Sequence, residues 1–120
     1  MILKDNFYTI LRKDADAMAY DIRLNPAHTI YQAHFPGEPV TPGVCILQIA
    51  RELLEDLLQR PLAVKSVKNM KFLSVISPLV TPQVSCCFEK VGQDAGIVSA
   101  QATIKTSDKE FVKLSFTLTA

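Results

Sequence analysis

The sequence has little excess charge and no long apolar run. Lys and Arg number 13 and Asp and Glu number 12, so the formal net charge is +1. A charge this small argues against nucleic acid as the main partner, because nucleic-acid-binding proteins usually have a strongly basic surface. No stretch approaches the length of a membrane span, and the N-terminal residues lack the apolar run and cleavage site of a signal peptide. We therefore expect a cytoplasmic protein with no membrane span.

Cysteine and histidine are scarce as well. The three cysteines are Cys45, Cys86 and Cys87. Neighbouring residues in a strand point to opposite faces, so Cys86 and Cys87 are poor disulfide partners, and we expect all three thiols to be reduced. The two histidines show no ligand spacing with these cysteines. The sequence therefore predicts no metal site and gives no sign of a cofactor.

A helical pattern runs from residue 44 to residue 58 without a breaker. Pro42 is expected as the first helical residue and Thr41 as the cap, because proline lacks an N–H and threonine can bond an unpaired one. Apolar side chains cover most of the circumference, which predicts a helix buried on most sides. The remaining positions form one polar stripe, made of Gln48, Glu52, Glu55 and Gln59.

Most of the other segments have strand patterns. Alternating or extended apolar patterns occur at residues 7–11, 20–24, 65–75, 80–91, 98–105 and 112–119. Residues 26–42 contain four prolines and no clear period, which predicts a long ordered loop of the kind that is usually functional. Strands joined by short turns pair antiparallel. At 120 residues the chain supports one domain, residues 1–120. We expect an α+β fold, a curled antiparallel sheet wrapped around one long central helix, and at least a dimer because the sheet edges would otherwise be exposed.

Residues 34–44 read HFPGEPVTPGV. This stretch resembles the HFPGxPxxPGV signature of the β-hydroxyacyl-acyl carrier protein dehydratases of fatty-acid synthesis. Asn25 and Tyr31, before the motif, and Phe72, after it, also match that family's pattern. The resemblance implies a hot-dog fold, dehydration of 3-hydroxyacyl thioesters on acyl carrier protein, and a homodimer or a larger or mixed assembly.

Dehydration needs a base for the C2 proton, a donor for the thioester oxygen and an acid for the leaving hydroxyl. His34 is the candidate base, and the N–H of Gly43, at the start of the helix, is the candidate oxyanion donor. The resemblance adds that the Val40 carbonyl orients the imidazole. Pro42 and Phe72 are further candidates to contact the substrate. Phe88 and His28 lie outside this motif. We expect Phe88 to be a core residue and His28 to be a surface loop residue.

The acid is where the sequence departs from the family. The family has Glu or Asp one turn inside the helix, contributed to the histidine of the other subunit, whereas this chain has Gln48, which has no proton to give. Glu52 takes the place where the glutamate-bearing enzymes commonly have glutamine, so the two side chains are exchanged. Residues four apart share a helix face, so Glu52 either supplies a carboxylate through a water or belongs to a solvated stripe.

Three functions follow from these residues. The first is a dehydratase with an altered acid, the second is an acyl thioesterase, and the third is a catalytically weak subunit that binds acyl carrier protein or completes a hetero-oligomer. The intact histidine loop favours the first, and Gln48 favours the third. Lys65, Lys68 and Lys71 could meet the acidic carrier protein, although strict alternation would put Lys68 on the opposite face from the other two.

Overall fold

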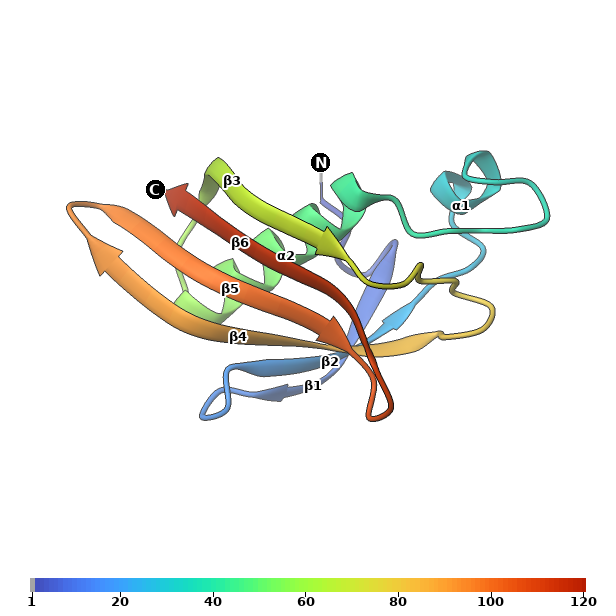
Figure 1. The fold of residues 1–120 in the computed structure, drawn as a ribbon, viewed down its shortest axis with the longest axis horizontal. Helices are drawn as coiled ribbons and strands as arrows, with labels where there is room; N and C mark the ends of the chain where they lie inside the picture. The colour runs from blue at the N-terminus through green and yellow to red at the C-terminus, as the bar shows by residue number, and fades with distance from the viewer. Residues whose placement is uncertain (1) are drawn as a thin grey trace.

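The computed structural model describes residues 2–120. Six strands form one antiparallel sheet in the order β1-β2-β4-β5-β6-β3, which curls around a long helix (Figure 1). The α+β arrangement expected from the sequence is confirmed. The elements in chain order are β1 (Tyr8–Asp14), β2 (Ala19–Leu24), α1 (Thr29–Ala33), α2 (Gly43–Leu58), β3 (Ala63–Phe72), β4 (Gln83–Asp94), β5 (Ile97–Lys105) and β6 (Glu110–Thr119). Of the helices in this range, neither has the length and apolar character that crossing a membrane requires.

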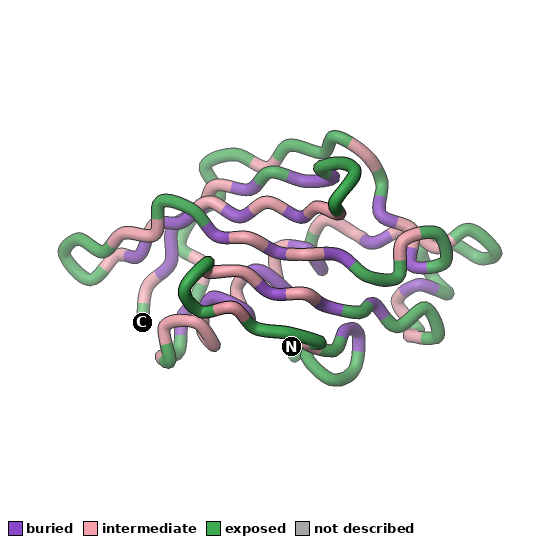
Figure 2. Tube along the Cα trace, turned by 90° about the horizontal axis from the view of Figure 1, so that it is seen from below, coloured by how far each residue is buried: buried purple, intermediate pink, exposed green. Residues whose placement is uncertain are grey.

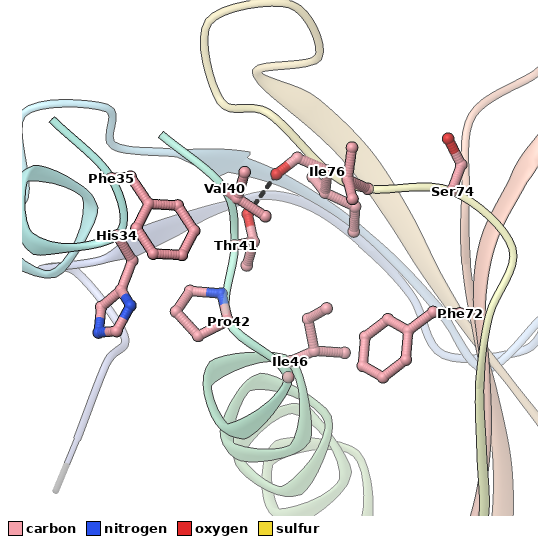
Figure 3. Close-up of a pocket in the computed structure, with 11 residues that line it drawn as sticks. His34, Phe35, Val40, Thr41, Pro42, Ile46, Phe72, Ser74 and Ile76 are labelled. Carbon is pink, nitrogen blue, oxygen red and sulfur yellow. Dashed lines mark hydrogen bonds between the residues drawn. The ribbon is translucent and has the colours of Figure 1, made fainter. Parts of the chain in front are cut away.

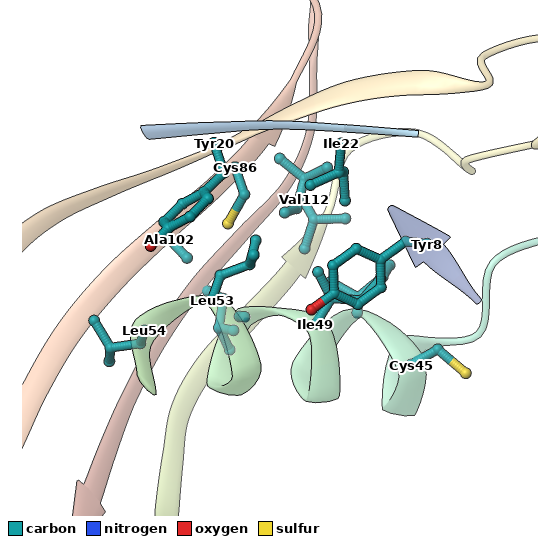
Figure 4. Packing of buried hydrophobic residues seen from close by; sticks show 14 of the residues in the cluster. Tyr8, Tyr20, Ile22, Cys45, Ile49, Leu53, Leu54, Cys86, Ala102 and Val112 are labelled. Carbon is teal, nitrogen blue, oxygen red and sulfur yellow. The ribbon is translucent and has the colours of Figure 1, made fainter. Parts of the chain in front are cut away.

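The central strands alternate between buried and partly exposed residues, as their sequence pattern predicts (Figure 2). In β5 the buried set is Val98, Ala100, Ala102 and Ile104. These residues pack on the inner side of α2, which buries a row of apolar side chains that includes Ile49 and Leu53 (Figure 4). Phe88 lies in the same core, as expected. Burial of this apolar surface is the main force that holds helix and sheet together.

The start of α2 differs from the prediction. The helix begins at Gly43, Pro42 occupies the N-cap position, and no side chain caps it. Thr41 is buried, and its hydroxyl donates to the Ile76 carbonyl at 3.0 Å instead of capping the helix. The expectations for Pro42 and Thr41 were therefore wrong, because a tertiary hydrogen bond competes for the threonine hydroxyl.

Residues 26–42 contain the short helix α1, which the proline-rich sequence did not reveal. His28 is its N-cap, and its Nδ1 accepts a hydrogen bond from the Ile30 N–H at 3.1 Å. The imidazole also meets the Phe7 ring edge-on, with the ring centroids 5.2 Å apart. His28 is thus half-buried rather than a surface residue, since it serves both the cap and the packing.

β3 pairs with β6 and not with the next strand along the chain. The connection to β4, residues 73–82, is long enough to carry the chain away from the β3 edge. β3 is consequently the last strand of the sheet, with no strand on its outer side within residues 2–120. The register with β6 skips Lys65 and Lys68, so each is the extra residue of a β-bulge.

Candidate active site

A pocket of about 270 Å³ opens beside the N-terminal end of α2 (Figure 3). Its walls come from three segments: the loop that precedes α2, the first turns of that helix, and the chain that follows β3. The lining residues are His34, Phe35, Val40, Thr41, Pro42, Gly43, Ile46, Phe72, Ser74, Val75 and Ile76. The structure thus brings together most of the candidate residues from the HFPG motif and Phe72.

Hydrogen bonds fix the loop that carries the motif. The Val40 N–H donates to the His34 carbonyl at 2.8 Å, and Phe35 and Glu38 exchange two backbone bonds across a tight turn. Gly37 lies in that turn with φ +79°, a conformation that a residue with a side chain rarely adopts. These bonds shape residues 34–40 independently of the rest of the pocket.

A second set of bonds ties the loop to the segment after β3. The Tyr31 hydroxyl and the Thr41 hydroxyl lie 2.8 Å apart, and the Thr41 N–H donates to the Ile76 carbonyl at 2.9 Å. Burial raises the pKa of Tyr31 to about 12, so the hydroxyl stays protonated at neutral pH. These bonds therefore hold two walls of the pocket together, the loop before α2 and the segment after β3.

His34 is exposed at the mouth of this pocket. In Figure 3, His34 and Phe72 are seen on opposite sides of Pro42 and Ile46. Within residues 2–120 the imidazole makes no hydrogen bond; the link to Val40 runs between backbone atoms, from the Val40 N–H to the His34 carbonyl. Orientation of the imidazole by the Val40 carbonyl therefore stays a prediction, and both ring nitrogens are available to a substrate.

Gly43 supplies the first N–H of α2, and this N–H has no acceptor within the described chain. The ring of Phe72 lies against Gly43, because a Cβ built on that glycine would be 2.9 Å from the Phe72 Cζ atom. Glycine is therefore needed for the close approach of this ring. An unbonded N–H at a helix N-terminus, beside an apolar pocket, is suited to hold a developing negative charge.

Gln48 and Glu52 do not line this pocket with His34. The Gln48 Nε2 donates to the Glu52 carboxylate at 2.6 Å. The same carboxylate accepts from the backbone N–H groups of Leu3 and Lys4, each at 2.8 Å, and from the Tyr8 hydroxyl at 3.0 Å. Figure 4 shows Tyr8 reaching towards α2 from β1. Only 9% of Glu52 is exposed, so of the two alternatives left open by the sequence, the solvated stripe is wrong for this residue.

The environment of Glu52 also explains the state of Tyr8. Burial and the neighbouring carboxylate raise the pKa of Tyr8 far above its ordinary value, so its hydroxyl remains a donor to Glu52. Each carboxylate oxygen accepts two hydrogen bonds. Sequence reasoning missed this arrangement, because two of the donors are backbone groups and carry no signal in the sequence. A catalytic role for Glu52 or Gln48 stays a prediction.

The rest of the polar stripe on α2 is also bonded to its surroundings. Glu55 accepts from the Leu62 N–H at 2.7 Å. Asp56, next to the stripe, accepts from the Tyr20 hydroxyl at 2.5 Å and pairs with Lys13 at 3.0 Å. The Tyr20 hydrogen bond lowers the pKa of Asp56. Within residues 2–120, no three His, Cys, Asp or Glu side chains are grouped so that they could hold a metal ion.

Comparison with known sequences identifies related dehydratases. The family model for ApeI-like proteins, described as ApeI dehydratase, matches residues 11–114. The 3-hydroxyacyl-[acyl-carrier-protein] dehydratase FabZ of Latilactobacillus sakei subsp. sakei (strain 23K) is 31% identical over 103 residues, covering 80% of this chain and 72% of the relative. FabZ of Ligilactobacillus salivarius (strain UCC118) is 24% identical over 123 residues, covering 97% and 86%.

Solved structures share the hot-dog fold with this chain. The dehydratase heterocomplex ApeI:P from Xenorhabdus doucetiae aligns with a TM-score of 0.63 and 16% identity, over 92% of this chain and 96% of that one. A hypothetical thioesterase with coenzyme A from Streptococcus pneumoniae TIGR4 aligns with a TM-score of 0.64 and 14% identity, over 98% and 91%. Likeness at this level shows the fold alone, since dehydratases and thioesterases both have it. The family model spans nearly all of the sheet together with α2 and the pocket, and the chain belongs to the ApeI-like dehydratase family.

Proposed function

We propose that this chain removes water from 3-hydroxyacyl thioesters carried by acyl carrier protein and forms trans-2-enoyl thioesters. One observation carries the proposal: the His34 imidazole and the Gly43 N–H, both without hydrogen bonds within residues 2–120, border the same apolar pocket. A base and an oxyanion donor beside an apolar cavity are what this reaction requires of a protein. The family membership and the FabZ relatives support the same substrate class.

The reaction can be written on these groups. The neutral imidazole of His34 takes the proton from C2, while the Gly43 N–H stabilises the charge that develops on the thioester oxygen. The C3–O bond then breaks, a double bond forms between C2 and C3, and the leaving hydroxyl takes up a proton to become water. The apolar side chains of Ile46, Val75 and Ile76 border the space available to the acyl chain.

The source of that last proton distinguishes this chain from the enzymes it resembles. Gln48 has no proton to donate, and Glu52 has both oxygens engaged inside its own subunit. Either the His34 imidazolium returns the proton, or a carboxylic acid on a second subunit supplies it. We propose that the working form is at least a dimer, because the pocket is open towards solvent at His34 in the single chain.

The experiment measures two products at once, the enoyl thioester formed by dehydration and the free thiol formed by thioester hydrolysis. Purified protein, at high concentration so that weak self-association is not limiting, is mixed with 3-hydroxyacyl-acyl carrier protein. The carbon–carbon double bond is followed by its absorbance and free thiol by a colorimetric reagent. We expect enoyl product without thiol release, and a faster rate for Gln48→Glu, which restores an acid to the helix. Release of thiol without enoyl product would identify a thioesterase and contradict the proposal.

A further inference from the structure

The pocket beside α2 extends along only the beginning of this helix. Of the α2 residues, Gly43 and Ile46 line it, and they lie on one face because they are three positions apart. Ile49, the next residue on that face, does not line the pocket and is 3% exposed. The rise of an α-helix puts Ile46 about 4.5 Å further along the axis than Gly43. Along the helix, the pocket therefore ends at Ile46.

Ile46 forms the inner end of the pocket and not its rim. Figure 3 shows its side chain standing between Pro42 and Phe72. Ile46 is 3% exposed, whereas Phe72 is 54% exposed. Ile46 also belongs to the same hydrophobic core as Ile49 and Ile76. A side chain that borders the pocket and is packed in the core cannot move aside without disturbing its neighbours, because protein interiors are close-packed.

The segment after β3 closes the pocket on a second side. Ile76 lines the pocket and is buried, and its carbonyl accepts the Thr41 N–H at 2.9 Å, which fixes its position. At the end of β3, Phe72 pairs with Val112 of β6, which is buried in the core. Buried side chains therefore stand behind the pocket on the sheet side as well as on the helix side.

We infer that Ile46 sets the length of the acyl chain and that the pocket accepts short 3-hydroxyacyl groups. The inference rests on the proposed function, in which the Gly43 N–H holds the thioester oxygen and His34 takes the proton from C2. With the thioester held there, the rest of the acyl chain has only the space up to Ile46. Further methylenes must stay in water, where they add no binding free energy, or press on a full core, which is unfavourable.

The test measures how the rate of dehydration depends on chain length. Acyl carrier protein is loaded with 3-hydroxybutyryl, 3-hydroxyhexanoyl, 3-hydroxyoctanoyl or 3-hydroxydecanoyl groups, and kcat/KM for each is obtained from the absorbance of the enoyl product. A methylene that enters an apolar pocket raises affinity by up to about four-fold, whereas one that has no space gives no gain. For the wild type, we expect kcat/KM to fall about ten-fold or more from the shortest chain to the longest.

Variants of Ile46 should change this length preference. Ile46→Ala removes three carbon atoms from the end of the pocket, and we expect the ratio of kcat/KM for the hexanoyl substrate to that for the butyryl substrate to rise about ten-fold. Ile46→Val removes one carbon atom and disturbs the core far less, so it carries the test if Ile46→Ala does not fold. It should raise the same ratio about two- to four-fold.

The matched control is Ile49→Ala, which makes the same truncation one turn deeper, at a core residue that does not line the pocket. It should leave the ratio unchanged. Each ratio compares two substrates on the same protein, so a loss of stability in any variant cancels. Equal kcat/KM for all the chain lengths in the wild type, or the same ratio in Ile46→Ala and Ile49→Ala, would overturn the inference. Dehydration of every chain length by the wild type would still leave the proposed function standing.

Binding of unreactive ligands separates the length limit from the reaction. Thioethers of pantetheine with butyl or decyl chains can neither lose water nor release thiol, and calorimetry gives their dissociation constants. The inference predicts that the wild type binds the butyl thioether more tightly than the decyl thioether and that Ile46→Ala narrows the difference. This result without any dehydration would contradict the proposed function and support the length limit. Tighter binding of the decyl thioether by the wild type would contradict the length limit.

Discussion

Polar groups at the start of α2 and polar groups along its later turns differ in how many hydrogen bonds they make. At the N-terminal end, the His34 imidazole and the Gly43 N–H have no hydrogen-bond partner within residues 2–120, and both border the pocket. About two and a half turns further on, Glu52 accepts four hydrogen bonds, and about one turn beyond it Asp56 is bonded to both Tyr20 and Lys13. Polar groups without hydrogen-bond partners therefore lie at the start of α2, and polar groups with several partners lie along its later turns.

The difference separates groups that hold the fold together from groups that are free to act on a substrate. A polar group that is buried without a partner costs free energy, so a structural carboxylate is normally surrounded by donors. Groups that bind a reacting molecule must exchange water for substrate instead, and they lie unpaired beside a cavity. By this criterion, we propose that the chemistry takes place at the beginning of α2 and that Glu52 stabilises the fold.

The largest effect is expected from removal of the His34 imidazole, the candidate base. His34→Ala should lower the rate of dehydration about 10²- to 10⁴-fold, the usual contribution of a positioned acid–base group. The thermal midpoint should hardly change, because the imidazole makes no hydrogen bond within residues 2–120. The matched control is His28→Asn, in which the amide oxygen can still cap α1 and activity should be retained. Near wild-type rates for His34→Ala would remove this histidine from the mechanism.

The next test addresses the saturated carboxylate. Glu52→Gln replaces one carboxylate oxygen with an NH₂ group that faces N–H donors, so at least one buried donor loses its acceptor. We expect a loss of about 2–3 kcal/mol in the free energy of unfolding, measured with urea, and a rate per folded molecule close to that of the wild type. Tyr8→Phe removes a single donor from the same carboxylate and should cost about 1 kcal/mol. An unchanged stability together with abolished dehydration would make Glu52 a catalytic residue.

The smallest effect concerns Asp56. Its pKa is lowered chiefly by the hydrogen bond from Tyr20, so ionised Asp56 stabilises the folded state. That contribution is fully present above the ordinary aspartate pKa of about 3.9 and is lost as the pH falls through the lowered value. Asp56→Asn should therefore cost about 1 kcal/mol at pH 7, and the difference from wild type should shrink in urea titrations at increasingly acid pH. A difference that stays constant with pH would exclude the charge of Asp56 as its source.

Much of this architecture follows from patterns within single segments. Alternation placed the central strands, the uninterrupted apolar pattern placed α2, and the HFPG motif placed the pocket, because each of these signals is local in sequence. What failed depends on contacts between distant segments. Thr41 bonds Ile76 instead of capping the helix, and Glu52 is buried under backbone groups of Leu3 and Lys4. Backbone N–H groups are the same for nearly every residue type, so the sequence does not indicate which of them will bond a buried side chain.

The hydrogen bonds from Leu3 and Lys4 to Glu52 also govern how the chain fluctuates. A segment outside the helices and strands opens on its own when little holds it to the rest of a domain. Here residues 3 and 4 cannot detach without leaving a buried carboxylate short of two donors. Opening of this segment is therefore linked energetically to the middle of α2, the same helix whose first turn borders the pocket. We therefore expect this segment and the middle of α2 to open together.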